Sequence, residues 1–182
     1  MVTPSIIEAV KKKEEGSFKV LYEKCIPYVF TVTKRHVSND SNIPDIIQEI
    51  FARVFLSISS YDPSKGDFTP WLRRLVVNQC YQFYRQEKST MLHVTLDNAS
   101  EVIDDDIDLN ALSKDEIEDL LNEMPDGYKQ VFLLIVIEEF KHEEVGELLG
   151  ISPSASRSQF SRAKKWVLRN IPGTLKSIAY GL

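Results

Sequence analysis

The most informative stretch of the chain is KHEEVGELLGISPSASRSQFSRAKKWVLRNI, residues 141–171. It predicts a helix over 142–149 that ends at Gly150, because glycine readily takes the left-handed conformation of a sharp turn. Ser152 and Pro153 are the residue types expected at the N-cap and the first position of a second helix. Two helices joined by a short glycine-containing turn form a helix-turn-helix, which we therefore predict near the C-terminal end.

The second helix of this motif should have an inward and an outward face. Ser156, Phe160, Ala163 and Val167 recur at helical spacing and are expected inside, with the Ser156 hydroxyl bonded to a backbone carbonyl one turn back. The opposite face carries guanidinium, ammonium and hydroxyl groups, which bind base edges and phosphates in a major groove. Residues 152–182 include six bases and no acid, whereas a merely solvated face would mix both signs. We therefore expect DNA binding.

The net charge of −5 averages over segments of opposite sign. Residues 97–126 carry twelve carboxylates against one lysine, and residues 68–89 carry four bases against one acid. Two basic segments thus flank an acidic one, which indicates contact with a polyanion at two places. The acidic segment could also fold back on the basic faces and weaken DNA binding by the free protein.

Helical periodicity also extends over the first half of the chain. Apolar spacing and Thr-Pro starts predict one helix from Pro4 to near Gly16 and a second that begins at a Ser17 cap, with a kink or break at Pro27. A third is predicted over 44–59 with Phe51 and Phe55 facing inward, and a fourth from Thr69-Pro70 through Tyr84. A capping box at Ser113 and Glu116 predicts a further helix ending near Met124. Residues 91–112 lack periodicity and read as an acidic, flexible linker.

The predicted fold class is therefore all-α, with two small helical domains joined by the acidic linker. The first domain is expected over residues 1–90, and the second, over residues 113–182, contains the helix-turn-helix.

No catalytic or metal-binding pattern is found along the chain. Cys25 and Cys80 are far apart without a CxxC motif, the three histidines form no HExxH motif, and no glycine-rich phosphate loop occurs. We expect no enzyme, metal or cofactor. The cysteine usage fits a reducing cytoplasm, and the longest apolar run, residues 131–137, is too short to insert into and cross a membrane.

Two further stretches carry a family resemblance. DIIQEIFARVF, residues 45–55, and FTPWLRRLVVNQCYQFYRQEK, residues 68–88, resemble the two signature stretches of region 2 of the sigma-70 family, and the helix-turn-helix resembles region 4. No segment remains for the extra domains of housekeeping sigma factors, so the resemblance is to the short extracytoplasmic-function (ECF) group. It implies a factor that binds core RNA polymerase, recognises promoter DNA at a −10 and a −35 element, helps to melt the former, and is held inactive by an anti-sigma factor.

The resemblance also implies roles for three sets of residues. The set expected to dock on core polymerase is Asp45, Gln48, Glu49, Ala52 and Arg53. The set expected at the −10 element is Tyr61, Ser64, Lys65, Arg73, Arg74, Asn78, Tyr81, Gln82 and Arg85. The set expected at the −35 element is Ser152, Ser154, Arg157, Ser158, Gln159, Arg162, Lys164 and Lys165.

Within these sets some roles are more specific. Asn78 stands at the asparagine of the family's helix motif and is placed near the base that is flipped out on melting. Arg157 and Gln159 are the candidates for reading −35 bases, while the more C-terminal cations are expected to bind phosphate. Residues 154–156 depart from the family's Gly-Thr-Val triplet, and Gln159 replaces an arginine, which leaves the −35 sequence open.

Two other classes of protein stay open at this point. A stand-alone helix-turn-helix regulator would bind duplex DNA without polymerase, as a symmetric dimer on a palindromic site. An interaction adaptor would bind no DNA and would use the first domain to hold a partner helix. The basic segment over residues 68–88 argues against a regulator with a sensing domain, because such a domain has no need of that charge.

Overall fold

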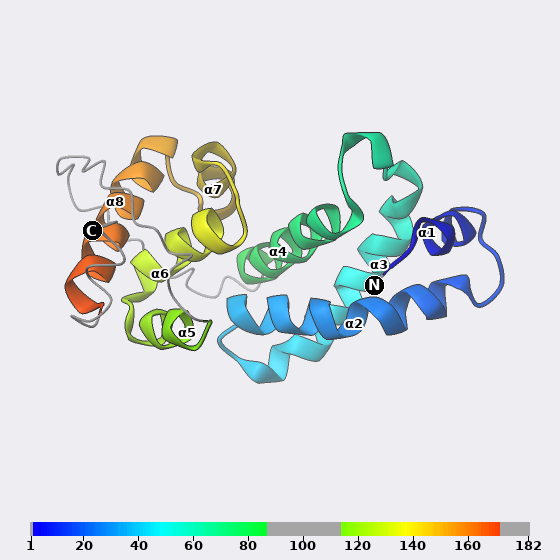
Figure 1. Ribbon diagram of the computed structural model, residues 1–182, viewed down its shortest axis with the longest axis horizontal. Helices are drawn as coiled ribbons and strands as arrows, with labels where there is room; N and C mark the ends of the chain where they lie inside the picture. Colours follow the sequence, from blue (N-terminus) through cyan, green and yellow to red (C-terminus); the bar gives the residue numbers. More distant parts are fainter. Residues whose placement is uncertain (1, 87–113, 172–182) are drawn as a thin grey trace. The chain divides into compact units, whose positions relative to one another are not determined.

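Helices make up all of the regular structure in residues 2–86 and 114–171, the part of the chain that the computed structural model describes. The chain divides into two units, Met1–Ser89 and Thr90–Leu182 (Figure 1). The predicted all-α class is confirmed. The predicted linker, residues 91–112, lies outside the described residues.

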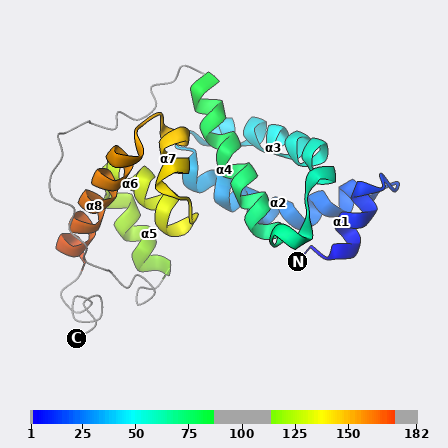
Figure 2. The same ribbon diagram turned by 90° about the horizontal axis from the view of Figure 1, so that it is seen from above.

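The first unit is built on three helices that pack against one another, with a short helix added at the N-terminus. Helices α2, α3 and α4 contact each other pairwise, and α1 packs on α2 (Figures 1 and 2). Their bounds are Pro4–Lys11 for α1, Ser17–His36 for α2, Ile43–Ser57 for α3 and Phe68–Gln86 for α4.

The core of this unit follows the predicted apolar stripes at their centres. Ile46, Ile50 and Val54, spaced by four residues along α3, are completely buried, and each contributes about 1.5–3 kcal/mol of hydrophobic stabilisation. Phe55, predicted to face inward, is 48% exposed. It lies at the edge of the stripe, one residue past Val54, and touches the ring of Phe18 with centroids 5.0 Å apart.

Helix α2 runs through Pro27 without the predicted break. Proline lacks the N–H that would bond one turn back and so removes one bond of the helix, but the packing of both halves of α2 keeps it continuous. The hydroxyl of Thr31 donates to the carbonyl of Pro27 at 2.9 Å. At the start of α2, Gly16 rather than Ser17 occupies the N-cap position, with a φ of +73°.

The described residues of the second unit form four α-helices. Helix α6 continues into a π-helical segment, Leu133–Ile137, and both α6 and α7 pack on α8. The core is a cluster of buried side chains at Leu121, Met124, Phe132, Leu133, Ala163, Val167 and Ile171. The helix bounds are Lys114–Glu123 for α5, Asp126–Phe132 for α6, His142–Leu149 for α7 and Pro153–Asn170 for α8.

Helices α7 and α8 form the predicted helix-turn-helix. Gly150 ends α7 with a φ of +69°, and Ser152 caps α8 by accepting a bond from the N–H of Ala155 at 3.1 Å. Gly146 allows the close approach of the turn, because a Cβ at this position would lie 2.7 Å from the carbonyl oxygen of Ile151. The capping and turn residues were therefore sufficient to predict the helix-turn-helix from the sequence.

Candidate partner and nucleic-acid interfaces

The predicted polymerase-binding residues lie together on the outer face of α3. All five are exposed, on the opposite side of the helix from its buried isoleucines. Beyond them along the helix, Phe55 and Leu56 are 48% and 77% exposed and add an apolar end to this polar face. The residues in the predicted set are Asp45, Gln48, Glu49, Ala52 and Arg53.

Two side-chain hydrogen bonds connect this face to α4. The Gln79 amide donates to the carboxylate of Glu49, and the Arg53 guanidinium donates to the amide oxygen of Gln82 at 3.0 Å. Gln79 is 4% exposed and was not among the predicted site residues. Its position, three residues after Val76 on the apolar side of α4, is the signal: a buried polar side chain needs a partner.

The predicted −10 loop projects from a short 3₁₀ helix, Pro63–Lys65, ahead of α4. Ser64 and Lys65 are exposed, as predicted. The Asp62 carboxylate accepts bonds from the Ser64 N–H at 2.9 Å and the Ser64 hydroxyl at 2.7 Å. These bonds lower the pKa of Asp62, which therefore stays charged and holds the loop in its turn.

Five of the predicted −10 residues on α4 reach the surface. Arg74, Asn78 and Arg85 are exposed and lie along one side of the helix, while Arg73 and Gln82 are half-buried. The side-chain amide of Gln82 is oriented by the hydrogen bond that its oxygen accepts from Arg53. The exposed set can offer two guanidinium groups and an amide to a DNA strand, which suits phosphate neutralisation and base contact.

Tyr61 and Tyr81, predicted to contact DNA, are buried in this structure, unlike the other predicted −10 residues. Tyr61 is 7% exposed; its hydroxyl donates to the Gly66 carbonyl at 3.0 Å, and its ring contacts those of Phe68 and Trp71. Tyr81 is 3% exposed, with its hydroxyl 3.4 Å from a ring nitrogen of His36. Both tyrosines position the loop and helix from within.

The predicted −35 face lies on α8, with one exception. Ser152, Ser154 and Arg157 are exposed, whereas Gln159 is 4% exposed and does not belong to the surface. Gln159 follows Ser156 by three residues and precedes Ala163 by four, so it falls within the buried stripe of the helix. The remaining predicted residues are half-buried: Ser158, Arg162, Lys164 and Lys165.

Phe160, expected inside, takes an intermediate position beside this stripe. Its ring contacts those of Phe132 and His142, and the Lys164 ammonium lies 5.5 Å from its centroid. The inward face of α8 therefore holds Ser156, Ala163 and Val167 as predicted, with Gln159 buried in place of Phe160.

Two polar contacts join α7 to α8. The Ser156 hydroxyl bonds to Nδ1 of His142 at 2.9 Å, instead of the predicted backbone carbonyl. Arg157 Nη1 donates to Glu143 Oε1 at 3.3 Å. Partial burial, and secondarily the positive charge of Arg157, lower the pKa of His142. A bond from its own backbone N–H, followed by the bond from Arg157, lowers the pKa of Glu143.

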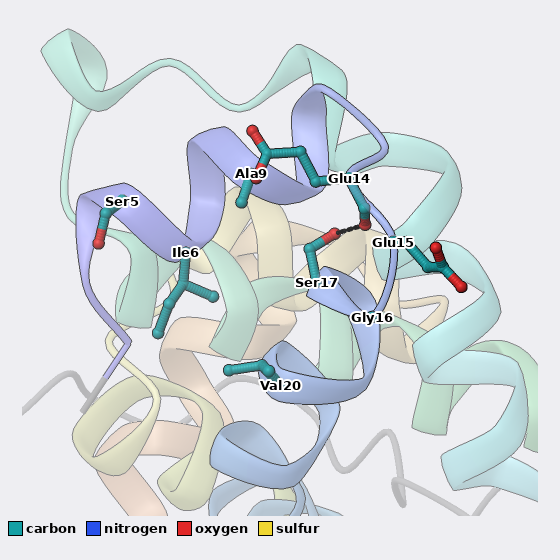
Figure 3. Close-up of a pocket in the computed structure, with 8 residues that line it drawn as sticks. All are labelled: Ser5, Ile6, Ala9, Glu14, Glu15, Gly16, Ser17 and Val20. Carbon is teal, nitrogen blue, oxygen red and sulfur yellow. Dashed lines mark hydrogen bonds between the residues drawn. The ribbon is translucent and has the colours of Figure 1, made fainter.

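The described residues also form one groove away from these surfaces. A groove of about 360 Å³ between α1 and the start of α2 is lined by Ile6, Ala9, Glu14 and Val20 among others, none of them a predicted site residue (Figure 3). Within residues 2–86 and 114–171 no group of three or more His, Cys, Asp or Glu side chains could hold a metal ion. None of the helices described is both long and apolar enough to pass through a membrane.

Two family models match the chain in the order of its units. Sigma-70 region 2 matches residues 21–90, and Sigma-70, region 4 matches residues 114–167. The first match holds most of α2 and all of α3 and α4, with the residues predicted to dock on polymerase and the loop before α4. The second match holds α5 through most of α8 with the helix-turn-helix.

Relatives cover almost the entire chain. The ECF RNA polymerase sigma-E factor of Haemophilus influenzae is 24% identical over 179 residues, which are 92% of this chain and 94% of that protein. The ECF RNA polymerase sigma factor SigW of Bacillus subtilis is also 24% identical over 179 residues, 91% and 94% of the two chains.

Among solved structures, the sigma factor RpoE of Bartonella quintana in complex with the anti-sigma factor NepR has a TM-score of 0.48 and 16% identity, over 85% of this chain and 96% of that one. With region 2 and region 4 matched in order and full-length relatives named for the group, the chain belongs to the sigma-70 family of RNA polymerase sigma factors, in the ECF group.

Proposed function

We propose that this chain is a promoter-specificity factor that binds core RNA polymerase and directs transcription initiation at a specific set of promoters. The observation that carries the proposal is the pairing of two surfaces on one chain: the exposed acidic-amide face of α3 in region 2 and the basic outer face of α8 in region 4.

The face of α3 is the proposed docking surface for core polymerase. Asp45, Gln48 and Glu49 offer carboxylate and amide groups in a row, and Phe55 and Leu56 offer apolar area next to them. Exposed apolar side chains beside polar groups are typical of protein interfaces, where a few buried anchors carry most of the binding energy. The two exposed apolar side chains therefore extend the predicted docking set.

The loop at Ser64 and Lys65 together with the outer side of α4 is the proposed −10 surface. Strand separation needs a polar pocket for an extruded base and cations for the phosphates beside it. Asn78 lies exposed between Arg74 and Arg85 along α4, which suits that task. Because Tyr61 and Tyr81 are buried, aromatic stacking by these two residues is not part of the proposal.

The outer face of α8 is the proposed −35 surface. Its N-terminal turns present Ser154 and Arg157, as expected of a recognition helix whose first residues reach base edges. Arg162, Lys164 and Lys165 continue the basic side and would bind phosphates, which adds affinity that falls steeply with salt.

The other classes of protein are less well supported. A stand-alone regulator leaves the exposed face of α3 without a role, and an adaptor leaves the basic face of α8 without one. Three further parts of the proposal rest on family membership. The chain is not itself an enzyme, it is located in the cytoplasm, and it is inhibited by an anti-sigma factor.

Run-off transcription on genomic fragments tests this function, with core polymerase alone compared with core polymerase plus the protein. We expect discrete new transcripts with the wild type. They should be lost with Asp45→Ala/Gln48→Ala and with Arg157→Ala. The matched control variants, Glu14→Ala/Glu15→Ala and Lys12→Ala, change exposed residues outside the proposed surfaces and should retain the new transcripts.

Each outcome separates the classes. If the protein gives no new transcripts but binds duplex DNA specifically in the absence of polymerase, the stand-alone regulator is supported instead. Binding to neither polymerase nor DNA would support the adaptor.

A further inference from the structure

Arg157, on the outer face of the recognition helix, is tied to the first helix of the motif. Its Nη1 lies 3.3 Å from Oε1 of Glu143 in the first turn of α7, and the side chains are 50% and 63% exposed. The ion pair therefore lies on the surface proposed to face DNA, and Glu143 was not among the predicted site residues.

We propose that Glu143 is a positioning residue that sets the base specificity of Arg157, with guanine as the base read. The inference rests on the proposed function, because it assigns a second residue to the same −35 surface.

The geometry of the guanidinium explains how one carboxylate can do this. An arginine carries five N–H donors in a rigid plane, so a bond at Nη1 restricts the orientation of the whole group. Such a bond leaves the edge formed by Nε and Nη2 for a second pair of acceptors. The acceptor pair that matches this edge in the major groove is O6 and N7 of guanine, the commonest specific contact of arginine.

The pair serves orientation more than stability. An exposed ion pair shifts an equilibrium by about fivefold or less. The approach of the two helices is held independently by the absence of a side chain at Gly146 and by the bond between His142 and Ser156. Removal of the Glu143 charge should therefore leave the helix-turn-helix folded while it frees Arg157 to sample other directions.

Glu143 should also have an opposing effect on affinity. Its carboxylate is held charged, and it lies beside Arg157 on the surface proposed to face DNA. The carboxylate of Glu143 and the DNA phosphates are both negative and repel each other. Neutralising Glu143 should therefore strengthen binding to DNA of any sequence, while it weakens the preference for one sequence over another. A folding defect would weaken binding to every sequence, which is the opposite sign.

The test uses the complete protein bound to core polymerase. The probe is a promoter fragment recovered by run-off transcription, with its −35 segment randomised, and the bound fraction is sequenced for each variant. We expect the wild type to prefer guanine at one position, Arg157→Ala to lose that preference, and Glu143→Gln to reduce it about two- to fivefold while binding more DNA overall at low salt. Glu147→Gln, the same charge change at an exposed position of α7, is the control and should leave the preference unchanged.

Three results would overturn the inference. An unchanged base preference in Glu143→Gln would show that Glu143 does not position Arg157, and uniformly weaker binding would show that its role is structural. A guanine preference that survives Arg157→Ala would show that another residue reads it. Failure of the wild type to bind the promoter with polymerase would instead count against the proposed function, so the two failures are distinguishable.

Discussion

At the scale of single residues, His142 lies where the two helices of the helix-turn-helix meet. Its ring is hydrogen-bonded to Ser156 and lies edge-on to Phe160. Burial, together with Arg157, lowers its pKa, although the carboxylate of Glu143 acts in the other direction. The neutral ring is therefore the form that fits between the two helices of the motif.

A pH dependence of stability follows from that shift. The unfolded chain takes up the proton near the ordinary pKa of 6.5, above the pKa of the folded form. The stabilisation is thus fully present above about pH 6.5 and is lost as the pH falls toward the folded value. Urea unfolding between pH 5.5 and 7.5 should show the wild type losing stability on acidification relative to His142→Asn, whose amide does not titrate. Parallel profiles for the two proteins would refute this assignment.

At the scale of elements, the turn between α7 and α8 depends on two glycines for different reasons. A Cβ at Gly146 would meet the carbonyl oxygen of Ile151 at 2.7 Å, and the two backbones would have to move apart. Gly150 has open space around it but a φ of +69°, which only strains a larger residue. A steric clash with backbone in a packed turn should cost more than an unfavourable dihedral angle.

Alanine substitutions should rank in that order. We expect Gly146→Ala to destabilise the second unit by about 2–3 kcal/mol and Gly150→Ala by about 1 kcal/mol, whereas the exposed Glu147→Ala should change it by less than about 0.5 kcal/mol. Urea unfolding of the second unit can be followed by the fluorescence of Trp166, which packs on the core of that unit. A Trp71→Phe background removes the other tryptophan of the chain. Equal losses for the two glycines would contradict the steric argument.

The elements also show which parts of the fold and site the sequence predicts. Caps and turns are local signals, so the ends of α7 and the start of α8 were predicted closely. Burial at the edge of an apolar stripe depends on where the neighbouring helix lies, which periodicity does not encode. Phe55 was therefore expected inside and is exposed, while Tyr81 and Gln159 were expected outside and are buried. The site surfaces were predicted as faces, but individual members at their edges were not.

At the scale of the whole molecule, the two proposed DNA-binding surfaces are joined in one chain. Each alone would bind weakly, and joining them makes the second contact intramolecular, so that the combined affinity exceeds either one. Core polymerase, bound through α3, would supply a third attachment. The charge of the chain is divided accordingly, with the acidic segment over residues 97–126 placed in sequence between the two basic ones.

The acidic segment provides the last prediction, which rests on charge alone because Asp104, Asp105, Asp106 and Asp108 lie outside the described residues. If it competes with DNA for the basic faces, replacing these four residues by asparagine should raise the affinity of the free protein for a promoter duplex, as measured by fluorescence anisotropy. The gain should be large at 10 mM salt, where charges act over about 30 Å, and small at 150 mM, where they act over about 8 Å. The gain in affinity should also shrink when core polymerase is bound, because polymerase then holds the basic surfaces in place.

A control for the change in net charge neutralises the same number of acids in the first unit, with glutamine at Glu8, Glu14, Glu15 and Glu23. An equal gain in that control would reduce the effect to net charge, and an unchanged affinity in the asparagine variant would mean that the acidic segment does not shield the basic faces.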